Sequence, residues 1–351
     1  MSVRQIIQSF DAWRAAGTPL VLATVYETVG STYSKPGHRI LIAADGDYRG
    51  LVSGGCLEGD LSDRARAVLA TDRPAPVTYD MRDAADEIFG LGVGCNGLLR
   101  VFLQPLHPER DYEPFASIAA ALVGRERAAL ATVIESAKAE LPVGATLLCS
   151  ARATRVFGVG DAAAALLEQR ARRTLATATA ELATEAGATV LFAPLKPIPR
   201  LLVLGAGLDA VPLVAMAAEL GWFVIVADHR PAYLSRGGFT GAERALLVEP
   251  GALGRALDLG AFDAIIVMSH HLATDRKYLA ELASIDAPYL GVLGPRARRT
   301  RLLADLGADS HGLEARLRGP VGIDIGADSP ESIALSILAD LQATLGGLKS
   351  Q

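Results

Sequence analysis

Apolar runs of strand length alternate with helix-period segments along the whole chain. In the C-terminal part they alternate almost one for one, as a parallel doubly wound α/β sheet requires. The clearest unit runs from Pro199 to Asp228. Its apolar strand, Leu201 to Leu204, leads through a glycine turn into a helical segment that ends at Leu220, and a second strand follows from Trp222. This pattern predicts a Rossmann-like domain.

The turn of that unit carries Gly205 and Gly207. Gly205 permits the tight turn, and Gly207 has no side chain that would keep a pyrophosphate off the backbone. The following helix presents free N–H groups to an anion. Asp228 is placed to bind a ribose hydroxyl, as in NAD-binding domains. Arg230 nearby could instead bind a 2′-phosphate, so NAD and NADP are both candidates. The alternative is a Rossmann-like domain that binds no nucleotide, in which the glycines are needed only because the tight turn has no room for side chains.

The N-terminal part mixes helices and strands in a different order and predicts an α+β domain. We place this domain at residues 1–107, a middle α/β segment of the same module at 108–197, and the Rossmann-like domain at 198–351. Three prolines in the stretch PLKPIPR precede the last boundary and are typical of a rigid linker. The sequence shows no internal repeat.

Composition narrows the range of partners. The net charge is -5 and half of the residues are apolar, which argues against nucleic acid as the main partner. No apolar run reaches membrane-spanning length without charge or glycine, and the N-terminus is amphipathic, unlike a signal peptide. The three cysteines form no paired framework, so a reduced cytoplasm is expected.

Two loops combine glycines with a cysteine: GGCLE at 54–58 and GVGCNG at 92–97. A thiol at a helix N-terminus can bind a soft metal or carry sulfur, and glycine-rich backbone can bind an anion. The alternative is that Cys56 and Cys95 are small apolar residues beside tight turns. Zinc is disfavoured, since the chain has no C-x-x-C motif.

Further polar residues follow the predicted strands of the last domain. His270 and His271 are expected at the carboxyl edge of the sheet, as ligand-binding or as structural residues. Asp275 is favoured as a helix cap. A group of arginines after Gly294 fits either a phosphate site or a solvated helix face: Arg296, Arg298, Arg299 and Arg301. No hydrolase, metalloprotease or Walker motif is present, and no proton relay for hydride transfer is apparent.

Taken together, these motifs resemble the XdhC/CoxI family of xanthine dehydrogenase accessory factors. The matching stretches include GLVSGGCLEGDL, GLGVGCNGLLRVFLQPL, VLGAGLDAVPLVAMAAELGWFVIVADHRP, VMSHHLATDRKYL and RGPVGIDIGADSPESIALSILADL. They follow the family order over nearly the whole chain. The resemblance implies a cytoplasmic protein, often a homodimer, that binds the molybdenum cofactor (molybdopterin). Such a protein assists sulfuration with a cysteine desulfurase and delivers the cofactor to a molybdenum hydroxylase of the xanthine dehydrogenase type.

The resemblance also implies a cofactor site, with Cys56 and Cys95 near the molybdenum. An accessory factor is favoured over a catalyst, and an NAD(P)-dependent oxidoreductase stays the alternative. Three residues depart from the family pattern: Leu208, Pro295 and His271. The residues implied in cofactor binding are Gly54, Gly55, Cys56, Glu58, Gly92, Gly94, Cys95, Gly205, Gly207, Asp228, His270, Gly294 and Arg296.

Overall fold

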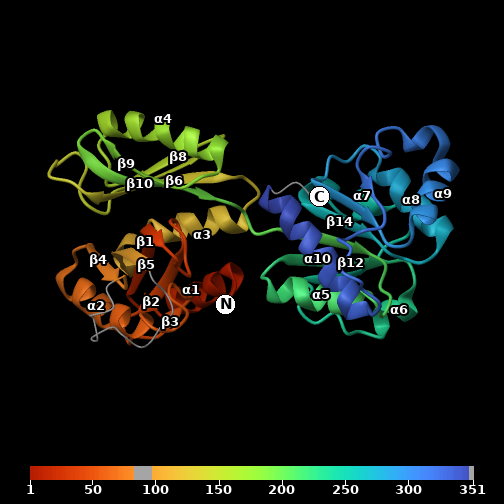
Figure 1. The fold of residues 1–351 in the computed structure, drawn as a ribbon, viewed down its shortest axis with the longest axis horizontal. Coiled ribbons are helices and arrows are strands. Elements are labelled where there is room, and N and C mark those ends of the chain that lie inside the picture. Colours follow the sequence, from red (N-terminus) through yellow and green to blue (C-terminus); the bar gives the residue numbers. More distant parts are fainter. Residues whose placement is uncertain (83–96, 348–351) are drawn as a thin grey trace. The chain divides into compact units, whose positions relative to one another are not determined.

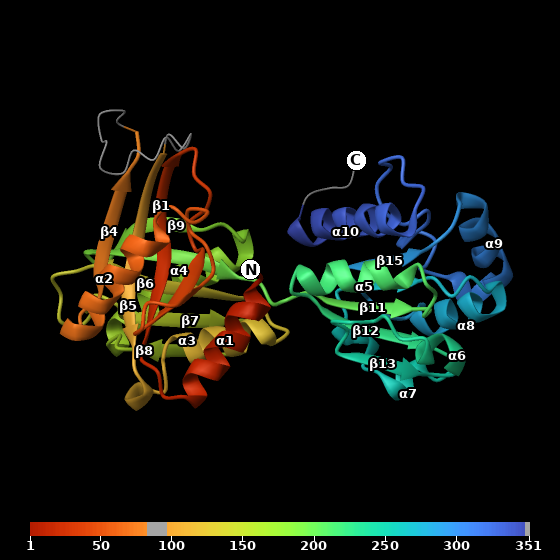
Figure 2. The same cartoon turned by 90° about the horizontal axis from the view of Figure 1, so that it is seen from below.

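A computed structural model describes residues 1–82 and 97–347 (Figures 1 and 2). The chain divides into two compact units, residues 1–197 and 198–351. Each unit has its own sheets and its own hydrophobic core. The predicted combination of an N-terminal α+β part and a C-terminal Rossmann-like sheet is confirmed, and the structure shows that the N-terminal sheets are antiparallel.

The first half of the N-terminal unit is a five-stranded antiparallel sheet in the order β3-β2-β1-β5-β4. Leu57, Leu61, Ala65 and Val68 pack the helix after β3 against one face of this sheet. The elements are α1 (Val3–Ala15), β1 (Leu20–Gly30), β2 (Arg39–Ala43), β3 (Tyr48–Arg49), α2 (Glu58–Thr71), β4 (Ala75–Asp80) and β5 (Gly97–Leu106).

The second half builds another five-stranded antiparallel sheet, in the order β8-β7-β6-β10-β9. Its helix, α4, follows the third of the five strands along the chain and precedes the fourth, as α2 does in the first half. This helix covers one face of the sheet. The elements are α3 (Phe115–Val123), β6 (Ala128–Glu135), β7 (Thr146–Ser150), β8 (Thr154–Phe157), α4 (Asp161–Thr177), β9 (Glu181–Glu185) and β10 (Ala188–Leu195).

The two halves are therefore a structural repeat, which the sequence does not reveal. Both central strands carry a β-bulge at the seventh residue, Tyr26 in β1 and Ile134 in β6. Gly37 and Gly144 each donate their N–H to the carbonyl of the residue before the bulge, at 2.8 and 2.9 Å. The repeat retains backbone geometry with different side chains, so residue identity alone does not disclose it.

The repeated sheets meet face to face. Tyr26, Phe102, Ile134 and Leu191 form a small apolar cluster between them. The bulged residues of both halves thus contribute side chains to the same contact, which fixes the sheets against each other.

The C-terminal unit is a six-stranded parallel sheet in the order β13-β12-β11-β14-β15-β16. Helices α5 and α10 bury apolar side chains on one face, and α8 and α9 do so on the other (Figure 2). The strands are β11 (Arg200–Leu204), β12 (Phe223–Asp228), β13 (Arg244–Leu247), β14 (Ala264–Val267), β15 (Tyr289–Val292) and β16 (Leu317–Arg318). The helices are α5 (Ala210–Glu219), α6 (Pro231–Ser235), α7 (Leu253–Ala256), α8 (Leu272–Leu282), α9 (Arg296–Leu306) and α10 (Pro330–Gly346).

The last helix begins at a serine followed by a proline, a helix-start signal that can be read in the sequence. Ser329 caps α10 by accepting the N–H of Ser332, and Pro330 occupies the first helical position. The preceding stretch VGIDIG is irregular, and it forms the wall of a pocket described below.

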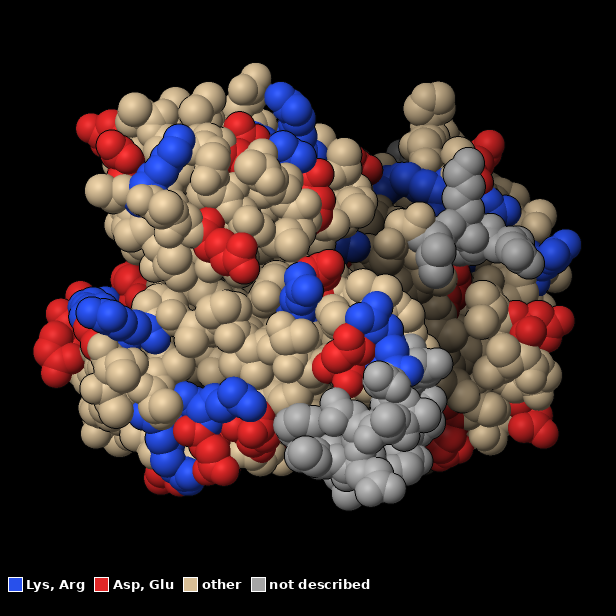
Figure 3. Space-filling view, turned by 60° about the vertical axis from the view of Figure 1, so that its left-hand side comes forward, with Lys and Arg blue, Asp and Glu red and all other residues tan. Residues whose placement is uncertain are grey.

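Charges of both signs are interspersed on the described surface that Figure 3 shows. Many charged side chains of the described residues form ion pairs, such as Arg170 with Glu181 and Arg172 with Glu168. Over residues 1–82 and 97–347, no helix combines the length and the apolar character that crossing a membrane requires.

Candidate functional site

The loop 50–57 connects β3 to α2 and is organised by the carboxylate of Glu58. This side chain is fully buried. Its Oε1 accepts the N–H groups of Val52 and Ser53 at 2.7 and 2.9 Å. Its Oε2 accepts the Ser53 hydroxyl at 2.6 Å and the N–H groups of Gly55 and Leu57 at 3.0 and 3.2 Å. Burial raises the pKa of Glu58, but the hydrogen bonds from Ser53 and Val52 outweigh burial and leave the pKa below its ordinary value.

This arrangement assigns Glu58 a supporting position in the loop. The carboxylate is the internal anion that the glycine-rich backbone binds, so four N–H groups of the loop are already used. Gly54 and Gly55 have φ values of 83° and 115°, which only glycine adopts without strain.

Cys56 is exposed, and a cavity of about 20 Å³ beside it is lined by Tyr33, Ser53 and Met81 among others. The thiol is therefore accessible to a soft metal or to a sulfur donor. Cys149, by contrast, is buried in the second sheet. The other predicted loop residues, Gly92, Gly94 and Cys95, lie outside the described residues.

The glycine turn of the C-terminal unit is tightly packed. Gly205 has a φ of 130°, and a Cβ there would lie 2.5 Å from the carbonyl oxygen of Met268. Asp228 is fully buried, accepts the N–H of Ala206 at 2.7 Å and forms an ion pair with Arg230. Burial raises the pKa of Asp228, but the bonds from Arg230 and Ala206 prevail and lower it. The carboxylate that would bind a ribose is thus engaged within the protein.

A second carboxylate lies at the N-terminus of α5, where a Rossmann fold places a pyrophosphate. Asp209 is the N-cap residue, and a Cβ on Gly207 would come within 2.4 Å of its Oδ1. His270, which is largely exposed, bonds through Nε2 to Asp209 Oδ2 at 2.7 Å. An anion at this helix end would meet the negative charge of Asp209. Leu208, one of the three departures from the family pattern, is 71% exposed.

Two of the polar residues that follow β14, His271 and Asp275, have structural roles at the start of α8. His271 is the N-cap residue of α8, and its Nδ1 bonds to Thr274 Oγ1 at 2.9 Å. Asp275 is buried in the first turn of α8, where it accepts hydrogen bonds from Ser269 and pairs with Arg298 at 2.6 Å.

Of the predicted arginine cluster, three members have partners: Arg298 pairs with Asp275, Arg299 donates to the carbonyl of Leu317 and Arg301 pairs with Asp305. Arg296 is exposed, and its guanidinium forms no hydrogen bond or ion pair with any residue of the described ranges. The cluster therefore reduces to a single guanidinium that is available for a ligand.

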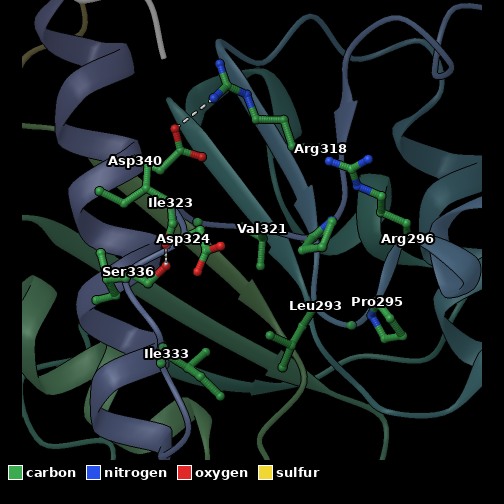
Figure 4. A pocket seen from close by; sticks show the side chains of 15 residues that line it. Leu293, Pro295, Arg296, Arg318, Val321, Ile323, Asp324, Ile333, Ser336 and Asp340 are labelled. Atoms are coloured by element: carbon green, nitrogen blue, oxygen red, sulfur yellow. Dashed lines mark hydrogen bonds and ion pairs between the residues drawn. The ribbon is translucent and has the colours of Figure 1, made fainter. Parts of the chain in front are cut away.

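Arg296 borders a cavity of about 1110 Å³ at the carboxyl ends of β15 and β16 (Figure 4). Its floor is apolar, formed by Leu293, Val321 and Ile333. Asp324 reaches into the pocket from the side of α10. The pocket also includes Gly294, Pro295, Arg318, Pro320, Gly322, Ile323, Ile325, Ala327, Ser336 and Asp340.

Close packing holds the wall segment 319–327 in place. Gly322 has a φ of 96°, and a Cβ there would lie 2.4 Å from Ser336 Oγ in α10. On the other side, a Cβ on Gly319 would meet the Arg299 side chain of α9 at 2.9 Å. The segment thus needs glycine at both points of contact. Its packing against α9 and α10 therefore forms this wall of the pocket.

A hydrogen-bond network around the buried side chains of Tyr289 and Asp340 completes the wall. Asp340 accepts the Tyr289 hydroxyl at 2.6 Å and pairs with Arg318 at 2.8 Å. Arg318 also stacks over the Tyr289 ring, 4.6 Å from its centroid. Burial and the bond to Asp340 raise the pKa of Tyr289, so its hydroxyl stays protonated.

Comparison with known proteins gives a family match in each of the two units. A family described as the XdhC Rossmann domain matches residues 201–341, and one described as the XdhC and CoxI family matches residues 13–80. A Bacillus subtilis (strain 168) protein described as a probable xanthine dehydrogenase subunit is 32% identical over 326 residues, which cover 92% of each chain. The chain belongs to the XdhC and CoxI family.

Two further relatives extend over most of this XdhC-family chain. The molybdenum cofactor insertion chaperone PaoD of Escherichia coli (strain K12) is 23% identical over 93% of this chain and 83% of its own. A crystal structure described as a xanthine dehydrogenase from Bacillus halodurans has a TM-score of 0.79 at 26% identity and covers 100% of this chain and 97% of its own.

Sequence reasoning did not single out the polar lining of the XdhC-family pocket: Asp324, Ser336 and Asp340. Asp324 lies in the motif GIDIGADSPES, so the resemblance contained the signal, but no spacing rule connects this residue with Arg296. Only the folded sheet brings segment 319–327 beside the start of α9.

Proposed function

We propose that this chain binds the molybdenum cofactor as cargo and delivers it, in the cytoplasm, to a xanthine dehydrogenase-type molybdenum hydroxylase. Membership of the XdhC and CoxI family supports an accessory role, and the alignment with the insertion chaperone PaoD over 93% of this chain carries the proposal. We further propose that the chain assists sulfuration together with a cysteine desulfurase and that it acts as a homodimer.

The available groups suit the chemistry of this cargo. Molybdopterin carries a flat ring, a phosphate and a dithiolene that binds molybdenum. The pocket offers an apolar floor and the free cation of Arg296, which fit a ring and a phosphate. The exposed thiol of Cys56 fits a soft metal or a transferable sulfur.

The test is purification of the full chain from cells that synthesise the cofactor, followed by measurement of bound molybdenum and of the oxidised pterin. We expect both to co-purify and the loaded protein to activate a cofactor-free hydroxylase. Absence of pterin above the level of an unrelated protein from the same cells would refute the proposal. A Cys56→Ala variant that binds and transfers normally would remove the thiol from the mechanism.

The alternative is an NAD(P)-dependent oxidoreductase, which the Rossmann-like glycine turn favours. Two features weigh against it: Asp228 is buried and paired, and Asp209 lies at the expected pyrophosphate position. Fluorescence titration with NADH and NADPH distinguishes the two functions, since only the oxidoreductase requires saturable binding of either nucleotide.

A further inference from the structure

Two charged side chains in the pocket at β15 and β16 are left without a matching charge. Within the described ranges the Arg296 guanidinium has no hydrogen-bond or ion-pair partner, and the Asp324 carboxylate accepts the N–H of Gly326, its near neighbour, at 3.2 Å. Both line the same cavity, Asp324 on the side of α10 and Arg296 at the start of α9 (Figure 4). Side chains of opposite charge that share a cavity unpaired are free to bind different parts of one ligand.

The other polar groups of the pocket are already engaged. Asp340 binds Tyr289 and Arg318, and the Ser336 hydroxyl donates to the carbonyl of Ile323. These contacts fix the wall, because an occupied partner does not reorient to meet a ligand without breaking a bond. Recognition of polar ligand groups therefore falls to Arg296 and Asp324.

The glycine turn does not compete for an anion in this unit. Asp209 fills the helix end there and is held by His270, at 2.7 Å. At α9 the first helical residue is itself Arg296, and the helix N-terminus adds a partial positive charge on the same side. The favourable place for a phosphate is thus at α9 and not at the dinucleotide turn.

Building on the proposed function, we propose that this pocket recognises a 2-amino-4-oxopyrimidine ring that carries a phosphate, with Asp324 bound to the ring edge and Arg296 to the phosphate. The amino group and the adjacent ring N–H of such a ring are two parallel donors. A carboxylate offers two parallel acceptors, the geometry that makes arginine–carboxylate pairs bidentate. Leu293, Val321 and Ile333 provide the apolar surface for the ring.

Pterins and guanine share this donor pair, whereas adenine lacks it. The test measures binding of molybdopterin, GMP and AMP to the full chain under anaerobic conditions. We expect molybdopterin to bind most tightly and GMP to bind more tightly than AMP. Asp324→Asn should abolish the preference for GMP over AMP, and Arg296→Ala should weaken all three ligands about tenfold to a hundredfold.

Matched controls come from the same elements. Arg301→Ala removes an exposed arginine of α9 that pairs with Asp305, and Asp328→Asn changes an exposed acid outside the pocket lining. Both should bind like the wild type. Thermal unfolding of each variant checks that the fold is retained.

The outcomes separate this inference from the proposed function. If the wild type binds molybdopterin and both pocket variants still bind like their controls, the inference is wrong and the carrier function stands. Equal binding of GMP and AMP to the wild type would overturn the role of Asp324. Binding of GMP without molybdopterin would refute the carrier function and leave the recognition of the ring edge intact.

Discussion

Glu58 illustrates how a charged residue becomes part of a loop's framework. A fully buried carboxylate is costly unless hydrogen bonds replace its water, and here four backbone N–H groups and one hydroxyl do so. The motif GGCLE could be recognised in the sequence, and the cysteine of this motif is exposed in the structure. The inward direction of Glu58 could not be predicted, because a first-turn acid in a helix more often faces solvent.

We predict that Glu58→Gln destabilises the N-terminal unit by about 3 kcal/mol at pH 7, since an amide NH2 would face N–H donors that are left buried and unpaired. The pKa of Glu58 is lowered by folding, so its stabilising effect is complete above the ordinary value of 4.5 and is lost as the pH falls through the folded pKa. Thermal unfolding of wild type and variant should show a difference in unfolding free energy that becomes smaller below pH 4.5.

Asp63→Asn, on the exposed side of α2, is the control for this experiment. It should change the unfolding free energy by no more than about 0.5 kcal/mol. A gap between wild type and Glu58→Gln that is independent of pH would contradict the role of the Glu58 charge.

At the scale of elements, hydrophobic periodicity predicts most helices and strands, and tertiary contacts decide the remainder. The alternation in the last domain predicts the parallel sheet, and α10 begins at its sequence signal. Hydrophobic periodicity does not predict strand β9 (Glu181–Glu185), because its sequence ELATE is polar and only pairing with β10 makes it a strand. The stretch VGIDIG has strand-like alternation but is irregular, since Gly322 has a positive φ and contacts α10.

We predict that Gly322→Ala displaces the pocket wall from α10, because its Cβ would collide with Ser336 Oγ at 2.4 Å. Molybdopterin binding should fall roughly tenfold, the equivalent of one lost charge-assisted contact. Gly326→Ala is the matched control: its φ of 71° imposes a similar backbone cost, but its Cβ would point into open space. Equal binding by the two variants would show that the contact with α10 does not shape the site.

At the scale of the molecule, the chain combines a duplicated antiparallel module with one Rossmann-like unit. The duplication is visible in strand order, in the bulges at Tyr26 and Ile134 and in the paired glycines Gly37 and Gly144. Only the first copy carries a glycine–cysteine loop between its third strand and its helix. The corresponding junction of the second copy, Gly158 to Asp161, has no thiol.

Since each unit has its own core, calorimetry of the full chain should resolve two unfolding transitions. Glu58→Gln should lower the temperature of one transition, and Gly322→Ala that of the other. A single transition that moves with both variants would mean that the units unfold cooperatively.

The buried carboxylates Glu58 and Asp228 have a consequence for turnover. Glu58 accepts four N–H groups of its loop and Asp228 accepts the N–H of Ala206 in the glycine turn, so both motifs are held by hydrogen bonds from within the chain. Under the proposed carrier function, release of cargo would therefore require no refolding of these loops, and the next round of loading would begin from a surface that is already folded.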